Sequence, residues 1–132
     1  MRNRKAKPIG FSKTHNRISN SLEKHKDSEE KKLEAKANNY MKTGAIKEAE
    51  MMFMDIFNKN QRNYEAISSL AIIYWRSNRQ KEAIIFLKKA IKLEPKEAIN
   101  YYHLGIAYQG TRELDLAEKS YLKAIDINQD FL

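Results

Sequence analysis

Apolar and small residues recur along the chain with the spacing of amphipathic helices. Ile67, Leu70, Ala71 and Tyr74, for example, lie at positions i, i+3, i+4 and i+7, on one face of a helix. With turn signals between the apolar stretches, this pattern predicts six helices, at about 29–43, 46–59, 64–77, 80–93, 97–109 and 114–127. The turns within successive pairs are expected at Gly44, at Asn78–Arg79 and at Gly110–Thr111.

The pattern recurs at a fixed interval, so that Tyr40, Tyr74 and Tyr108 occupy equivalent positions. Its most complete copy, residues 98–131, has the apolar and small positions Tyr101, Leu104, Gly105, Tyr108, Ala117, Tyr121 and Ala124. The preceding copy has Ile67, Leu70, Ala71, Tyr74, Ala83, Leu87 and Ala90, and Pro95 closes it. The first copy has Leu33, Ala37, Tyr40, Ala49, Phe53 and Ile56, with Lys36 where a leucine is expected. It is therefore the most degraded of the three.

The recurring residue types have a physical explanation. A small residue in the first helix of each pair and another in the second allow two backbones to approach closely, and large side chains fill the space beside them. These small residues are Ala37, Ala71 and Gly105 in the first helices, and Ala49, Ala83 and Ala117 in the second. No pair can bury its apolar face alone, so stability is expected to come from stacking on neighbours.

The spacing of an aromatic, Leu-Gly and Tyr, followed by Ala and an aromatic, resembles the tetratricopeptide repeat (TPR) family. Gln129 stands where that family has a proline. The resemblance covers residues 30–131 and implies an all-α fold, a right-handed α-solenoid of three TPR helix-turn-helix units with six helices. The expected domain is 29–132, with repeats at about 30–63, 64–97 and 98–131.

Composition agrees with one small helical domain. The chain has 132 residues, 42% of them hydrophobic, and only four glycines and two prolines. It has no cysteine, which excludes disulfides and thiolate metal sites. It also lacks an apolar run long enough for a transmembrane helix or a secretory signal, so a cytoplasmic location is predicted by default.

The net charge of +8 is concentrated in residues 1–28, which contain eight basic residues and two acidic ones. Because this segment has few large apolar residues, it is predicted to be a basic, largely disordered leader. One interpretation is an arm that touches RNA, anionic lipid or an acidic protein. The favoured one is a solvated leader, since no aromatic residues interleave with the charges. Nucleic acid is accordingly disfavoured as a partner.

Apolar residues on the non-core side of the first helices form a second row. Ile72 and Trp75 occupy it in the second unit, and Ile99, Tyr102 and Ile106 in the third. Stacked units would line a concave groove with them, and such side chains anchor peptides or partner helices. Polar residues expected among them are Asn38, Ser68, Ser69, Arg76, His103 and Gln109. The alternative is that Trp75 and Ile72 pack inside the domain.

One TPR function implied by the resemblance can be tested on residues. TPR domains that hold acidic chaperone tails use a clamp of Lys and Asn, then Asn, then Lys and Arg. The matching positions here are Glu34, Asn38, Ser69, Ile99 and His103. Only Asn38 agrees, and Glu34 would repel a carboxylate. Chaperone-tail binding is therefore not expected.

No arrangement of residues indicates catalysis or a cofactor. The histidines, His15, His25 and His103, do not lie at ligand spacing from one another, so no metal site is predicted. There is no glycine-rich phosphate loop and no serine nucleophile elbow. We therefore expect no enzyme activity, no cofactor and no metal.

The sequence thus predicts a protein–protein interaction scaffold that binds a peptide or helix of a partner protein in the groove. The alternatives are a nucleic-acid-associated protein that uses the basic leader, or the N-terminal accessory region of a larger enzyme. The last predicted helix ends where a further unit would stack. Either the chain belongs to a longer TPR protein, or the C-terminal helix end self-associates.

Overall fold

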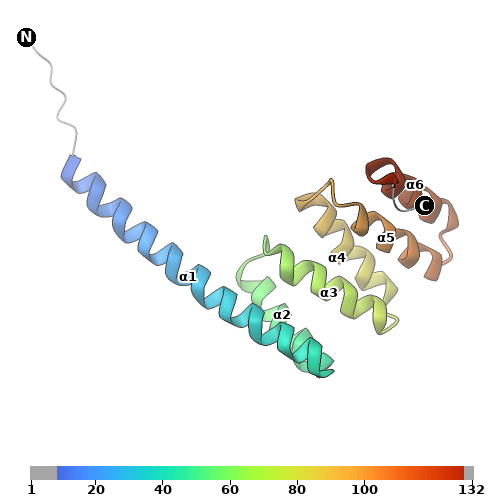
Figure 1. The fold of residues 1–132 in the computed structure, drawn as a ribbon, viewed down its shortest axis with the longest axis horizontal. Coiled ribbons are helices and arrows are strands. Elements are labelled where there is room, and N and C mark those ends of the chain that lie inside the picture. Colours follow the sequence, from blue (N-terminus) through green and yellow to red (C-terminus); the bar gives the residue numbers. More distant parts are fainter. Residues whose placement is uncertain (1–8, 130–132) are drawn as a thin grey trace, which may run out of the picture. The chain divides into compact units, whose positions relative to one another are not determined.

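The computed structural model describes residues 9–129, and within them it contains six α-helices and no strand. The helices are α1 (Ile9–Thr43), α2 (Ile46–Lys59), α3 (Tyr64–Arg76), α4 (Gln80–Leu93), α5 (Ala98–Gly110) and α6 (Leu114–Ile127) (Figure 1). The chain divides into two compact units, Met1–Leu33 and Glu34–Leu132. The division falls inside α1, so the last turns of α1 belong to the same unit as the other five helices.

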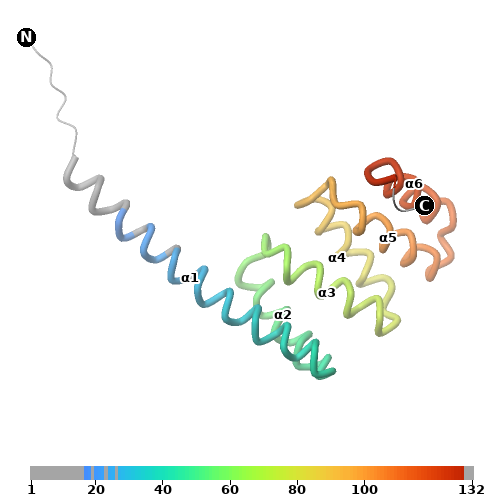
Figure 2. The backbone as a smooth tube through the Cα atoms, in the orientation of Figure 1, coloured from blue at the N-terminus to red at the C-terminus, as the bar shows by residue number. Residues whose placement is uncertain are grey.

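Within the compact unit Glu34–Leu132, the helices recur at the same interval as the repeat in the sequence. Helices α2, α4 and α6 are equal in length and start at the evenly spaced positions Ile46, Gln80 and Leu114, as the backbone trace allows the reader to follow (Figure 2). The turn after each first helix contains one left-handed residue, at Gly44 (φ 83°), Asn78 (φ 61°) and Arg112 (φ 64°). We expected the third turn at Gly110–Thr111. Thr111 lies in the turn, but Gly110 is the last residue of α5, and the left-handed conformation falls on Arg112.

Successive helices pack against one another, α2 on α3, α3 on α4, α4 on α5 and α5 on α6. The small residues of the repeat lie where the helices are buried: Ala37, Ala49, Ala71, Ala83 and Ala117 are each at most 2% exposed. Gly105 shows why small residues are needed, because a Cβ atom there would lie 2.5 Å from the Tyr121 ring. The predicted all-α solenoid of paired helices is confirmed.

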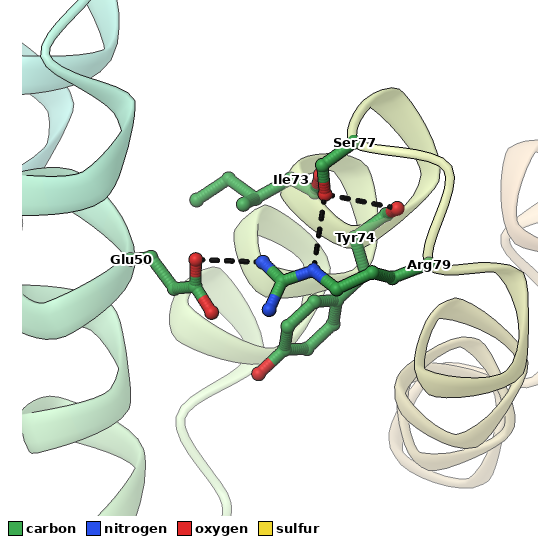
Figure 3. Close-up of polar contacts among 5 residues, drawn as sticks. All are labelled: Glu50, Ile73, Tyr74, Ser77 and Arg79. Atoms are coloured by element: carbon green, nitrogen blue, oxygen red, sulfur yellow. Dashed lines mark hydrogen bonds and ion pairs between the residues drawn. The ribbon is translucent and has the colours of Figure 1, made fainter.

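A polar contact links the turn between α3 and α4 to α2 (Figure 3). Arg79 Nη2 donates a 2.7 Å hydrogen bond to Glu50 Oε2, and Arg79 Nε donates to Ser77 Oγ at 3.2 Å. The guanidinium carbon also lies 4.5 Å from the centre of the Tyr74 ring. Burial, followed by the charge of Glu50, raises the pKa of the Tyr74 hydroxyl, so this tyrosine stays neutral.

The structure differs from the prediction of a disordered leader over 1–28. Helix α1 begins at Ile9, well before the start expected at about residue 29, and residues 1–8 lie outside the described residues. The prediction assumed that a segment needs buried apolar surface to be ordered. However, residues 11–43 contain neither glycine nor proline, so no helix-breaking residue interrupts α1 between its packed end and residue 11. The described side chains from Arg17 to Glu29 are all exposed, consistent with the low apolar content.

Candidate functional site

The row of apolar residues predicted to bind a partner lies on α3 and α5. Ile99 is 39% exposed and Tyr102 38% exposed. Ile72, Trp75 and Ile106 are half-buried. None of the five belongs to the buried core, although Ile73 and Tyr74 between them in α3 do. The row therefore offers apolar surface at positions that the packing of the repeats does not use up.

Four rings, Trp75, Tyr102, His103 and Tyr121, form a continuous aromatic cluster across three helices. The rings of Trp75 on α3 and His103 on α5 stack, with centroids 5.7 Å apart and planes inclined by 20°. Tyr102 contacts His103 at 6.0 Å and Tyr121 of α6 at 5.8 Å. Because each ring is held by its neighbour, the cluster is pre-organised, which lowers the entropic cost of binding.

Burial sets the charge state of the cluster. It lowers the pKa of the His103 imidazole below its ordinary value of 6.5, so His103 is neutral at neutral pH. Burial also raises the pKa of the Tyr121 hydroxyl, which donates a 2.5 Å hydrogen bond to Gln109 Oε1. At neutral pH the cluster carries no net charge and offers apolar ring faces.

The polar residues predicted beside the row have varied surroundings. Ser68 Oγ donates to the Glu65 carbonyl at 3.3 Å, so its hydroxyl already has a hydrogen-bond partner within α3. Ser69 is half-buried, whereas Arg76 and Gln109 are exposed near the ends of their helices. Of these, only Arg76 and Gln109 are exposed, and Gln109 Oε1 accepts the hydrogen bond from Tyr121.

At the junction of α1 and α3, two carboxylates are each paired with an amide. Asn63 Nδ2 donates to Glu34 Oε1 at 2.6 Å, and Asn38 Nδ2 donates to Glu65 Oε1 at 3.3 Å. Asn63 also caps α3, since its Oδ1 accepts from the Ala66 amide at 2.8 Å. Of the three positions where an acidic-tail clamp has a cation, Glu34 is negative and Ile99 is apolar, while His103 is neutral, and Asn38 already has a partner.

Three surface cavities are lined mainly by residues outside the row. One of about 610 Å³ lies between α5 and α6, and is lined by Tyr101, Leu104, Tyr108, Leu116, Lys119, Ser120, Leu122, Lys123 and Asp126. A second, of about 560 Å³, lies on α2 and includes Met51 and Met54. A third, of about 400 Å³, includes Ile99 at the start of α5. Of the row, only Ile99 lines any of these three cavities.

Neither a metal site nor a membrane span is found in the part of the chain that the structure describes. No group of three or more histidine, aspartate or glutamate side chains there is placed to hold a metal ion. None of the described helices combines the length and apolar character needed to cross a membrane.

Comparison with protein families settles what the paired helices are. The model of the tetratricopeptide repeat matches residues 64–97 and 98–131, together more than half of the chain. The chain belongs to the tetratricopeptide repeat family. The two matched TPR segments correspond to α3–α4 and α5–α6. A comparison with curated proteins found no significant match.

Several solved structures share this fold. The first TPR of Spaghetti (RPAP3), bound to the HSP90 peptide SRMEEVD, has a TM-score of 0.68 and 23% identity over 74% of this chain and 77% of that one. The Yersinia enterocolitica type III secretion chaperone SycD, in complex with a peptide of the translocator YopD, gives 0.70 and 17% over 74% and 75%. A Thermobaculum terrenum O-GlcNAc transferase mutant gives 0.69 and 22% over 77% and 20%. These identities establish a shared fold.

Sequence reasoning did not include Tyr121 among the candidate site residues, because its position in the repeat is a core position. The structure shows a half-buried ring that contacts both Gly105 and Tyr102. The signal was present in the sequence. The third unit combines its smallest residue, Gly105, with a larger ring at 121, where the second unit has Ala71 and Leu87.

Proposed function

We propose that this TPR protein is an interaction module that binds a peptide or helix of a partner protein on the face formed by the apolar row and the aromatic cluster. One observation carries the proposal: Ile99 and Tyr102 are exposed beside the stacked pair Trp75–His103, at positions the core does not require. Exposed aromatic and aliphatic side chains on a rigid helical support are the usual anchors of a protein interface.

The chemistry of the face favours an apolar or aromatic anchor residue in the ligand. The cluster is uncharged at neutral pH, and Gln109 and Arg76 supply polar contacts at its edge. Toward α1 the face becomes acidic, because Glu34 and Glu65 accept hydrogen bonds only from amides. A peptide rich in carboxylates would meet these glutamates and be repelled.

Two of the similar structures are complexes with peptides, and their shared fold supports peptide binding by this chain as an analogy. The first TPR of Spaghetti (RPAP3) is bound to an HSP90 peptide, and the secretion chaperone SycD is in complex with a peptide of the translocator YopD. The ligand itself does not transfer, because the clamp positions differ here.

We further infer that residues 30–63 act as the first repeat of the module. The family model matches only the two later repeats. However, Ala37, Ala49 and Phe53 occupy the repeat positions of the first copy and are fully buried. A third repeat would extend the binding face to Asn38.

The test is selection of short linear peptides from a random library against the native chain, followed by titration of labelled peptides by fluorescence anisotropy. The double variant W75A/Y102A removes two anchors. Because aromatic anchors contribute about 2 kcal/mol or more each, we expect binding to weaken by roughly a hundredfold or more. The matched control is I85A, which truncates an exposed apolar residue on α4 and should leave affinity unchanged.

Two results would contradict the proposal. Unchanged affinity of W75A/Y102A for the selected peptides would place the binding face elsewhere. Loss of helical circular dichroism in the double variant would show that the two side chains belong to the core. The HSP90 peptide SRMEEVD serves as an acidic probe, and we expect no saturable binding of it at up to about 1 mM.

A further inference from the structure

The last helix described, α6, has three exposed leucines. Leu114 is 62% exposed, Leu116 41% and Leu122 57%. Leu116 and Leu122 also line the cavity of about 610 Å³ between α5 and α6. Leu114 is two residues from Leu116 and so lies on a different side of α6, which leaves Leu116 and Leu122 as the apolar side chains beside the cavity.

The second repeat provides an internal reference for these positions. At the equivalent places on α4, the chain has Gln80, Glu82 and Lys88 instead of the three leucines. Glu82 and Lys88 are exposed. The repeat therefore folds with polar side chains at these positions, and packing within the repeat does not require the leucines of α6.

The inner side of the same cavity is a stacking surface without a following helix in the described chain. In the second repeat, Ile67 and Leu70 are 1% and 0% exposed, and α5 packs on α4. The corresponding Tyr101 is half-buried and Leu104 is 7% exposed, and both line the cavity. The α5–α6 end is thus shaped to receive another helix.

Two of the three charged side chains that line the cavity, Lys119 and Asp126, are self-complementary. Lys119 and Asp126 both line the cavity and lie two helical turns apart, or about 10 Å along α6. Leu122 lies between them. Neither Lys119 nor Asp126 forms an ion pair with another described residue. If a second α6 ran antiparallel across the first, Lys119 of each copy would face Asp126 of the other, and the two Leu122 side chains would meet.

We propose that the occupant of this face is a second copy of the chain, paired through α6 about a two-fold axis near Leu122. A two-fold contact needs a surface on which residue i meets j while j meets i, and Lys119 and Asp126 provide that relation. The leucines supply the apolar contact, and the paired charges fix the antiparallel direction. Lys123 lies at the flank of the contact, beside its own symmetry mate, and this pair of like charges is a repulsion that the two Lys119–Asp126 pairs and the leucines must outweigh.

The test is sedimentation velocity of the full chain over a wide concentration range at physiological ionic strength. The native chain should shift from its 15.5 kDa monomer toward twice that mass as concentration rises. The variant L116E/L122K copies the residues of α4 at both positions, so it is compatible with the repeat. Because it removes two leucines from each copy, the dimer dissociation constant should rise at least about tenfold. The matched control I85K, which copies Lys119 onto α4, should dimerise as the native chain does.

Charge exchange tests the antiparallel pairing. K119D and D126K should each weaken the dimer a few-fold, because each places like charges opposite one another. The double variant K119D/D126K restores opposite charges in exchanged positions and should recover native dimerisation. W75A/Y102A should leave it unchanged, which separates this surface from the proposed peptide-binding face.

Three results would overturn the proposal. The first is a native chain that remains monomeric at all concentrations, as expected if the face serves a different protein. The second is L116E/L122K dimerising as strongly as the native chain. The third is a charge-exchanged double variant no better than its single variants, which would exclude the antiparallel arrangement. Circular dichroism of each variant checks that the helices are intact.

Discussion

At Gly105, the absence of a side chain is a packing requirement. A Cβ atom there would lie 2.5–2.9 Å from three atoms of the Tyr121 ring, closer than side chains tolerate. The second repeat solves the same contact with Ala71 and Leu87. The side-chain volumes at the two positions therefore compensate each other. The larger ring on α6 fits because the residue opposite it on α5 has no side chain.

This coupling predicts the behaviour of Gly105→Ala. Alanine favours the helix by about 0.5–1 kcal/mol, but overpacking against Tyr121 costs about 1–3 kcal/mol, so we expect a net loss of stability. In the double variant G105A/Y121L, which copies the second repeat, the substitution at 105 should no longer destabilise. Urea unfolding, monitored by circular dichroism, measures the free energy of unfolding of both variants. A G105A variant as stable as the native chain would mean that the ring moves aside without cost.

His103 gives the cluster a pH dependence that can be predicted in sign. Burial lowers its pKa in the folded state, so between that value and 6.5 the unfolded state binds the proton more readily. The free energy of unfolding should therefore decrease as pH falls through this interval. H103F keeps an aromatic ring against Trp75 but removes the titration, and its pH profile should be flatter.

The measurement for His103 is urea unfolding at a series of pH values from about 7 to 5, where most carboxylates remain ionised. H25N is the matched control, because His25 is an exposed histidine on α1, outside the cluster. Identical slopes for the native chain and H103F would show that His103 does not contribute to the pH dependence of stability.

Among the elements, the sequence predicted the helices after α1 well and the start of α1 poorly. The ranges 46–59, 80–93 and 114–127 agree with α2, α4 and α6, because small residues and apolar spacing mark both ends of a buried helix. In α1 the periodic pattern marks only the part that packs, from about residue 29. The N-terminal extension has exposed described side chains, so no core pattern records it.

The exposure of the first part of α1 predicts the effect of removing it. Deleting residues 1–28 should change the free energy of unfolding by less than about 0.5 kcal/mol, because the described side chains from Arg17 to Asp27 are not buried. The far-ultraviolet circular dichroism should lose helical signal at the same time. The urea midpoint measures the first effect. A clear drop in that midpoint would show that this segment supports the repeats.

At the scale of the whole molecule, the sequence could separate the apolar row, which we propose binds a partner, from the core, but not how that row is held. The repeat period separates core from non-core positions, so Ile99 and Tyr102 stood out as unexplained apolar residues. The stacking of Trp75 on His103 and the contact of Tyr102 with Tyr121 join different helices. Such contacts depend on the angle between helices, which a one-dimensional pattern does not encode.

A stacked architecture also predicts an order of local stability. Each repeat is stabilised by its neighbours, and α6 has a neighbour on one side only among the described helices. Its buried residues are Ala117, Ser120 and Ala124, whereas α4 buries the larger Phe86 and Leu87. Backbone amides of α6 should therefore exchange hydrogen with solvent faster than those of α4, by roughly tenfold or more at low concentration.

Hydrogen exchange at two protein concentrations then joins local stability to assembly. A second copy seated on α6 would cover Leu116 and Leu122, so protection of α6 should increase with concentration while that of α2 stays constant. In L116E/L122K, the exchange rates of the α6 amides should not depend on protein concentration, because this variant lacks the leucines of the pairing surface. Concentration-independent exchange in the native α6 would mean that this end of the solenoid is stable alone, and that its leucines serve another contact.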